Sequence, residues 1–291
     1  MHRETSGRRI PGVGLWIWLI GILFFQSLYP QPASLEPVFK WQIGEDLTYR
    51  VNWSFFRLGT LRIQVLEKRL HRGEPVYRCR LFIDSNPALP FVNIHDIYES
   101  FIGEDMFSRA FYAWEKKSGY VIYTEYQMDY QNNLLHIIIE KHTPQDTTRL
   151  LDSLATLDRK ILDGLSILFY ARAMAKHKAE IYVPVIAYNK ISDAYLNIRG
   201  EKRRVKTRGE KVEGYYLDGR LKFVGIAGIK EGFRGWFSPD EQSVPIKAYM
   251  KAFIGSVRIE LEEWDQWNAR LVFKNPENWG KPLPAVQQEL D

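Results

Sequence analysis

Two groups of residues in this chain have side chains that could do chemistry. His95, Asp96 and Glu99 could each ligate a metal, but no helical H-E-x-x-H motif fixes their geometry. Ser166 could act as a nucleophile, yet it lies in Gly-Leu-Ser-Ile-Leu and not in the G-x-S-x-G turn of hydrolases. We therefore predict ordinary surface polar residues at 95–99, a packed or hydrogen-bonded serine at 166, no metal and no cofactor.

A second constellation predicts structural polar contacts and no reaction. Arg172 follows Phe169 by one turn of a predicted helix, so its guanidinium is expected near the sheet. Ser238 and Asp240 lie in a predicted turn at 236–240, where their oxygens can accept hydrogen bonds from backbone amides. We predict a structural Arg–Asp contact here. An arginine and an aspartate supply no nucleophile, so the sequence indicates that the protein is not an enzyme.

Composition excludes several classes of protein. The net charge of +5 arises from 40 basic against 35 acidic residues, a mixed balance that favours solubility and gives no nucleic-acid signature. Cys79 is the single cysteine, which excludes an internal disulfide and a cysteine-rich zinc site. Aromatic residues make up 14% of the chain and favour β structure.

One internal segment concentrates positive charge. The segment Arg199–Lys211 holds seven basic residues and two acids. It could bind anionic lipid headgroups or a polyanionic glycan, or it could contact an envelope protein. Alternatively, it is a solvated hairpin whose charges protect an edge strand from pairing with other chains. The sequence leaves both interpretations open.

The N-terminus is typical of an exported protein. Met1–Arg9 carries three arginines, and no charged side chain follows between Ile10 and Leu35. The densest apolar run, Val13–Phe25, fits a secretory signal peptide, although the uncharged segment is also long enough for one membrane anchor. We predict that residues 1–33 are a signal peptide or signal anchor, and that the protein is periplasmic or anchored to the inner membrane.

Period-two alternation predicts a mostly antiparallel β domain. In Leu47–Phe55 every odd position is apolar and every even position is polar, which is typical of a strand with one buried face. Short turn sequences such as Asp218-Gly219 and Ile254-Gly255 indicate hairpins. Similar alternation predicts strands at 61–65, 77–84, 108–116, 120–128, 134–140, 180–187, 194–199, 205–208, 211–217, 220–226, 233–237, 246–252 and 256–262.

One segment breaks this period. Apolar residues recur every three or four positions and predict a helix at about 162–176, with Asp158 or Asp163 able to cap its start. The predicted fold class is mainly β, a curved or partly closed antiparallel sheet with one packed helix. The helix could cover the concave side of one sheet at 38–265, or it could link two β subdomains that meet near 145–160. Residues 274–291 have no periodicity and are expected to form a poorly ordered tail.

Three stretches of the chain resemble a known bacterial family. The first stretch is Gly44–Trp53 followed by Leu58-Gly59-Thr60, the second is Leu162–Arg172, and the third runs from Gly235 through Val244-Pro245-Ile246 to Gly255. Their order and spacing resemble the envelope family called domain of unknown function 3108 over about residues 40–265. The resemblance implies an exported β-rich domain without an established activity. More remotely, it is similar to curved-sheet lipoprotein carriers that hold acyl chains.

These expectations lead to one functional hypothesis and its alternatives. The inward aromatic stripes are richer than one helix needs for cover, so we predict a cavity for a lipid or other amphiphile between sheet and helix. The candidate cavity residues are Tyr49, Trp53, Phe55, Ile63, Phe169 and Trp236. One alternative is a structural or assembly protein of the cell envelope that binds a protein or glycan. A hydrolase or transferase would need converging catalytic groups, which the sequence does not contain.

Overall fold

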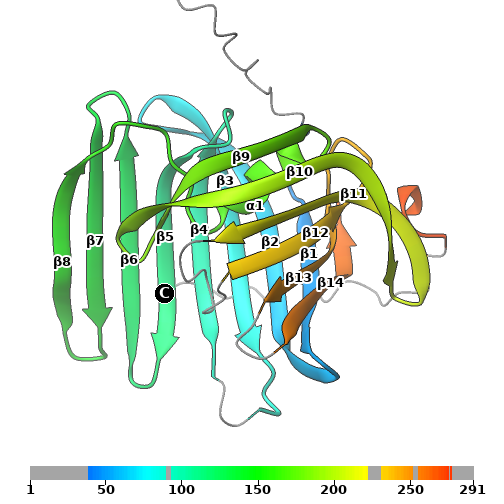
Figure 1. Cartoon of the computed structure of the whole chain (residues 1–291). Coiled ribbons are helices and arrows are strands. Elements are labelled where there is room, and N and C mark those ends of the chain that lie inside the picture. Colours follow the sequence, from blue (N-terminus) through cyan, green and yellow to red (C-terminus); the bar gives the residue numbers. More distant parts are fainter. Residues whose placement is uncertain (1–38, 90–92, 222–230, 252–254, 275, 277–291) are drawn as a thin grey trace, which may run out of the picture. The chain divides into compact units, whose positions relative to one another are not determined.

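The fold was analysed in a computed structural model of the chain. It describes residues 39–89, 93–221, 231–251, 255–274 and 276 (Figure 1). The chain divides into two units, Met1–Glu36 and Pro37–Asp291, and everything below concerns the described residues of the second unit. The predicted signal peptide or anchor and nearly all of the predicted tail lie outside the described residues. Within the described residues, no helix combines the length and the apolar character that crossing a membrane would require.

One antiparallel sheet of fourteen strands contains all the named strands (Figure 1). The first eight are β1 (Asp46–Trp53), β2 (Phe56–His71), β3 (Glu74–Ser85), β4 (His95–Gly103), β5 (Ser108–Lys117), β6 (Tyr120–Asp129), β7 (Leu134–His142) and β8 (Thr147–Thr156). After the helix α1 (Ser166–Met174) come β9 (Lys178–Ala187), β10 (Lys190–Thr207), β11 (Glu210–Leu221), β12 (Glu231–Phe237), β13 (Pro245–Lys251) and β14 (Ser256–Asp265). The fold is therefore mainly β, as predicted.

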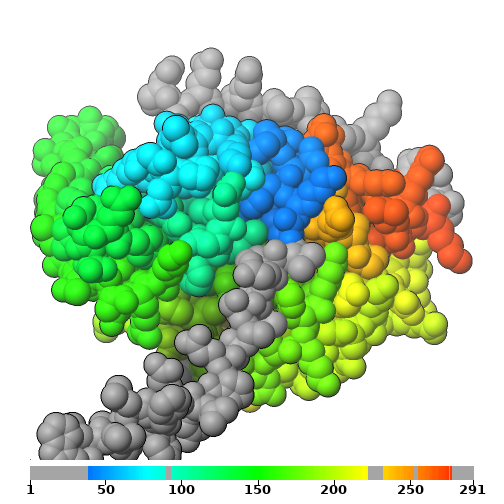
Figure 2. Space-filling model, turned by 90° about the horizontal axis from the view of Figure 1, so that it is seen from above, coloured from blue at the N-terminus to red at the C-terminus, as the bar shows by residue number. Residues whose placement is uncertain are grey.

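The strand order creates two arms that meet at the centre of the sheet. It runs β8-β7-β6-β5-β4-β3-β2-β1-β14-β13-β12-β11-β10-β9, so the first and last strands pair with each other. Figure 2 shows the blue residues near the start of the domain bordering the orange residues near its end. The alternative of two β subdomains, which the sequence left open, therefore does not apply to the described residues, because both arms belong to one sheet.

The segment before α1 bridges the two arms. Ser108 of β5 donates its backbone N–H to the carbonyl oxygen of Ile161 over 3.1 Å. The next residue, Leu162, exchanges backbone hydrogen bonds of 2.9 and 2.8 Å with Pro184 and Ile186 of β9. Since one short segment bonds to strands from both arms, the sheet must curve back toward itself. The sheet is nevertheless not closed, because its edge strands β8 and β9 do not pair with each other.

Helix α1 is packed on several sides and not on one stripe alone. Phe169 belongs to the main core cluster, Met174 packs with β9 and β10, and Ala171 packs against Leu217 and Phe237. Six of its nine residues are buried. Such burial explains why the helix keeps its place although nine residues are too few for a stable isolated helix. The helix is shorter than the predicted span of about 162–176.

Two strands were missed by the sequence analysis. In β4 six consecutive residues, Tyr98 to Gly103, are buried, so the strand lacks the alternation by which it could be recognised. In β8 most residues are exposed, because this strand lies at the edge of the sheet, and the alternation is again weak. Both omissions have the same cause: period-two reasoning detects only strands with one wet and one dry face.

The longest hairpin also differs from its prediction. The strands predicted at 194–199 and 205–208 are one strand, β10, in which a bulge between Ile198 and Lys202 changes which side chains face the core. The predicted turn at Asp218-Gly219 was wrong, because both residues lie within β11. At Gly219 an added Cβ would lie 2.3 Å from the carbonyl oxygen of Tyr195, so glycine here allows close packing and no turn.

Gly59 in β2 offers a test of this close packing. A Cβ at Gly59 would lie 2.0 Å from the backbone carbonyl oxygen of Asp84 on β3. We expect Gly59→Ala to lower the free energy of unfolding by about 3 kcal/mol, the upper end of typical overpacking costs, because backbone cannot move aside as a side chain can. Gly232→Ala is the matched control, since its Cβ would meet nothing closer than 3.8 Å. Equal denaturation midpoints for the two variants would contradict this account.

Candidate functional site

An apolar cavity lies between α1 and strands from both arms of the sheet. Its volume is about 240 Å³. The arm that begins at β1 and the arm that ends at β14 both contribute to it, and α1 provides a further wall. The main lining residues are Tyr49, Leu61, Ile63, Leu81 and Ile83 from the first arm, Leu165, Ile167, Leu168 and Ala171 from the helix region, and Leu196, Leu217, Phe233, Phe237, Ala248 and Ile259 from the second arm.

The two charged residues in the lining direct their charges elsewhere. The Lys247 ammonium bonds to the carbonyl oxygen of Lys206 over 2.7 Å and to the Glu260 carboxylate over 2.8 Å. The Arg234 guanidinium lies 4.7 Å from the ring centre of Tyr249. Arg234 pairs with Tyr249 across the strands β12 and β13. The next pair, Gly235 and Ala248, lies on the opposite face of the sheet, which lines the cavity. The cavity interior is consequently apolar.

Tyr49 lines the cavity and also carries a hydroxyl group that is itself buried. Burial raises the pKa of Tyr49 well above its ordinary value, against the opposing effect of the nearby Arg172 charge, so the phenol stays neutral. Its hydroxyl has no hydrogen-bond partner among the residues that the structure describes. A buried polar group in that state is costly to the folded protein.

Of the six predicted cavity residues, two line the cavity, two are buried elsewhere and two are exposed. Tyr49 and Ile63 line the cavity. Phe169 is fully buried but faces a different neighbourhood, where its ring stacks 5.1 Å from that of Trp41. Trp236 is buried on the opposite face of the sheet, with its ring 5.2 Å from that of Tyr216.

Trp53 and Phe55 were predicted wrongly as cavity residues. Their side chains are 38% and 81% exposed. The alternation that begins at Leu47 does extend to Phe55, but β1 ends at Trp53 and the chain turns away from the core there. Period-two alternation cannot show where a strand leaves the covered part of a sheet.

Arg172 forms a buried ion pair beside the cavity wall. Its two terminal nitrogens each donate to one carboxylate oxygen of Glu45 over 2.7 Å. The guanidinium also donates to the carbonyl oxygen of Gln242 over 2.9 and 3.2 Å. Its centre lies 4.8 Å from the ring centre of Phe39. The predicted Arg–Asp contact was wrong, since the partner of Arg172 is Glu45.

Asp240 and Ser238 instead order the connection between β12 and β13. The Asp240 carboxylate accepts from the backbone N–H of Gln242 over 2.9 Å and from the indole N–H of Trp267 over 3.1 Å. The Ser238 hydroxyl accepts from the backbone N–H of Val244 over 2.7 Å. This turn fixes the Gln242 carbonyl that Arg172 binds.

Ser166 belongs to a buried polar cluster at the start of α1. The Asp163 carboxylate accepts hydrogen bonds of 2.7 Å from the hydroxyls of Ser100 and Ser108, and of 2.7 and 2.8 Å from the amides of Leu165 and Ser166. The Ser166 hydroxyl in turn accepts from the amide of Asp163 over 2.7 Å. Burial raises the pKa of Asp163 despite these bonds. Asp163 thus serves the start of the helix, and the cluster has no imidazole to act as a base.

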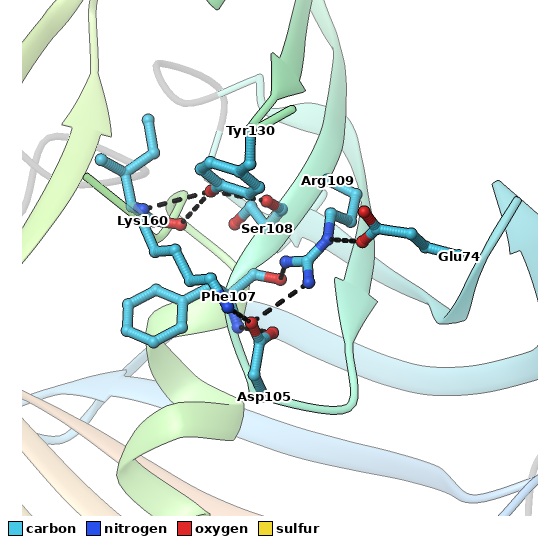
Figure 3. Close-up of polar contacts among 8 residues, drawn as sticks. Glu74, Asp105, Phe107, Ser108, Arg109, Tyr130 and Lys160 are labelled. Carbon is cyan, nitrogen blue, oxygen red and sulfur yellow. Dashed lines mark hydrogen bonds and ion pairs between the residues drawn. The ribbon is translucent and has the colours of Figure 1, made fainter. Parts of the chain in front are cut away.

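A second polar cluster holds the segment before the helix (Figure 3). Asp105 accepts from Lys160 over 2.5 Å and from Arg109 over 3.1 Å, and Arg109 also donates to Glu74 over 2.6 Å. Burial acts to raise the pKa of Asp105, but the hydrogen bonds from Arg109 and Lys160 outweigh it and lower the pKa. The Tyr130 hydroxyl donates to the carbonyl oxygen of Ser108 over 2.8 Å, and it accepts from the amide of Ile161. The cluster thus ties β3, β5 and the residue after β6 to residues 160 and 161.

The three candidate metal ligands, His95, Asp96 and Glu99, lie on β4 and each has different partners. His95 binds Asp84 over 2.8 Å, Asp96 accepts from the amide of Lys116, and Glu99 is paired with two arginines. Across the described ranges, no group of three or more potential ligands could hold a metal ion.

The basic segment is a hairpin of β10 and β11 with partly paired charges. Arg204 binds Glu213 over 3.1 Å, Arg203 pairs with Glu201, and Arg199 binds Asp218 over 3.4 Å. The pairs are solvent-exposed to differing degrees and contribute little to stability. Binding of a glycan, lipid or protein by this segment stays a prediction.

Comparisons with known proteins assign the chain to a family. A family model described as "Protein of unknown function (DUF3108)" matches residues 48–262. The chain belongs to the DUF3108 family. No curated protein matches this DUF3108 chain. A solved structure described as a beta-barrel-like protein of domain of unknown function DUF1849 from Brucella abortus is similar, with a TM-score of 0.47 and 9% identity, over 78% of this chain and 98% of that chain.

The three stretches that suggested DUF3108 meet at the buried ion pair. Glu45 lies in the first stretch, Arg172 ends the second, and Gln242 lies in the third. The sequence analysis found Arg172 but missed Glu45, because the two residues are 127 positions apart. The only indication of this partner in the sequence was that Glu45 is an acidic residue just before the first strand.

The pair can be tested by removing one charge and then both. We expect Glu45→Gln to lower the free energy of unfolding by about 3–5 kcal/mol, because the Arg172 charge is left buried without its counterion. Glu213→Gln, at an exposed pair, should leave the value nearly unchanged.

The double variant Glu45→Met/Arg172→Met should recover part of the loss, because neither charge then remains in the core. Chemical denaturation of all four proteins measures these differences. A Glu45→Gln variant as stable as Glu213→Gln would contradict the account.

Proposed function

We propose that this protein is a non-enzymatic binding protein of the bacterial cell envelope that holds a lipid or other amphiphile in the cavity beside α1. The observation that carries the proposal is the apolar cavity of about 240 Å³ between the helix and both arms of the sheet. Binding sites for small molecules are typically apolar hollows with a few polar groups, and this cavity has that character. The envelope location rests on the predicted export signal at residues 1–33.

The size of the cavity favours a single narrow chain. A protein cavity of about 150 Å³ holds one benzene molecule, so about 240 Å³ has room for roughly ten carbon atoms on the same scale. Most of the lining side chains are aliphatic, and they would make no specific contact with a ring system of a ligand. A medium-length acyl chain therefore fits better than a bulky or multi-chain lipid.

The Arg172 charge beside the cavity does not require an anionic headgroup, because Glu45 already balances it.

A cavity-filling substitution tests the proposal. Ala248 lines the cavity on β13, and Ala248→Trp would occupy part of its volume. We expect this variant to bind a dansyl-labelled fatty acid at least about tenfold more weakly than the wild type, as measured by fluorescence titration.

The control is Ala155→Trp, which makes the same change at an exposed position of β8. This variant should bind like the wild type. If the wild type does not bind the probe, or if both variants bind equally, the cavity proposal fails. The alternative, an envelope assembly protein that binds a protein or glycan through Arg199–Lys211, would then take its place.

A further inference from the structure

Three exposed aromatic residues occupy the tip of the β1–β2 hairpin. Trp53 and Phe56 face each other across the strands, and Phe55 lies in the turn between them. Their side chains are 38%, 49% and 81% exposed, and the rings of Phe55 and Phe56 are 4.2 Å apart. Exposed aromatic side chains occur singly on most proteins, but a contiguous group marks an interaction surface.

The start of β14 lies beside this tip. At Gly255, next to the start of β14, an added Cβ would lie 3.6 Å from the indole nitrogen of Trp53. The backbone there has a φ of +72°, so Gly255 forms a turn beside the indole ring. Trp53 also pairs in register with Val257, so the start of β14 lies beside the β1–β2 tip.

Basic residues outnumber acidic ones directly behind the tip. Arg50 and Arg57 both pair with the single carboxylate of Glu262. Lys247 and Arg258 likewise share Glu260, at 2.8 and 3.0 Å. Lys247 is buried, so the cations that reach solvent here are those of Arg50, Arg57 and Arg258. Three exposed cations therefore lie beside two carboxylates on the strands that support the hairpin, and the local charge is positive.

We propose that the β1–β2 tip docks on an anionic lipid bilayer, with the three aromatic rings entering the headgroup region. Aromatic side chains favour the interface between water and hydrocarbon, and cationic side chains next to them attract anionic lipids. The positive surroundings favour an anionic bilayer over an apolar protein surface that has few acidic residues. The inference does not depend on the cavity, because the tip lies outside its lining.

A fluorescent label at the tip tests the docking in the full chain. Phe55→Cys would carry an NBD group, whose emission shifts to the blue and gains intensity in apolar surroundings. Cys79 does not interfere, because it is fully buried. Leu154→Cys on β8 provides the control label, since Leu154 is 67% exposed and lies on a distant edge strand. Comparing two positions in one protein separates tip docking from insertion of the N-terminal segment.

The expected result is a blue shift for the label at position 55, and none at position 154, on vesicles of phosphatidylcholine with phosphatidylglycerol. Nitroxide-bearing lipids should quench the first label and spare the second. Vesicles of phosphatidylcholine alone should give a smaller shift, because the arginine side chains then lack anionic partners.

A label at position 55 that keeps its aqueous emission on both vesicles would overturn the proposal, as would equal shifts at both positions. The exposed tip would then be assigned to a protein partner. Failure here would leave the fatty-acid titration untouched, so the two proposals can fail separately.

Discussion

The buried contact between Arg172 and Glu45 organises the parts of the domain that form the cavity. Both side chains are almost completely inaccessible to solvent, at 0% and 1% exposure. Transferring two charges from water into the core is expensive, and that cost is offset only when each charge is matched and its hydrogen bonds are made. Here the carboxylate receives two bonds from the guanidinium and a third, of 3.4 Å, from the side-chain amide of Gln242. The guanidinium reaches one backbone carbonyl as well. An arrangement this constrained admits few alternative positions for the helix.

Three distant parts of the chain are fixed by that contact. Arg172 lies in the last turn of α1, Glu45 precedes β1, and Gln242 lies between β12 and β13. Residues 157–163 hold the other end of the helix, through the Asp163 cluster and the contacts drawn in Figure 3. With both ends held by polar contacts, the apolar side of α1 can border a cavity without collapsing into it. Because both of its ends are fixed, α1 can keep the cavity open beside its middle residues.

How far the sequence predicts this structure depends on the kind of signal each element leaves. Alternation identifies β1 and β14, where one face is wet, but it fails for β4, which is buried along most of its length, and for β8 at the sheet edge. The helix is recognisable because its period differs from that of its surroundings.

Contacts between distant residues leave no such local signal. Tyr49 and Ile63 could be predicted to face inward, yet the partner of Arg172 could not be identified, because pairing depends on how the sheet curves. Phe55 shows the reverse error, since a residue that continues the pattern of an inward face can lie beyond the end of the covered sheet. The local pattern therefore predicts faces, while the curvature of the sheet decides which of those faces meet.

Taken together, the two proposals would make this a protein that takes an amphiphile from a membrane surface. Native mass spectrometry of the full chain purified from bacterial envelopes tests the central part of this account most directly. We predict a bound species in the mass range of a single-chain lipid, which is lost on denaturation and absent from the Ala248→Trp variant. A wild-type protein with the same mass under native and denaturing conditions would contradict the account.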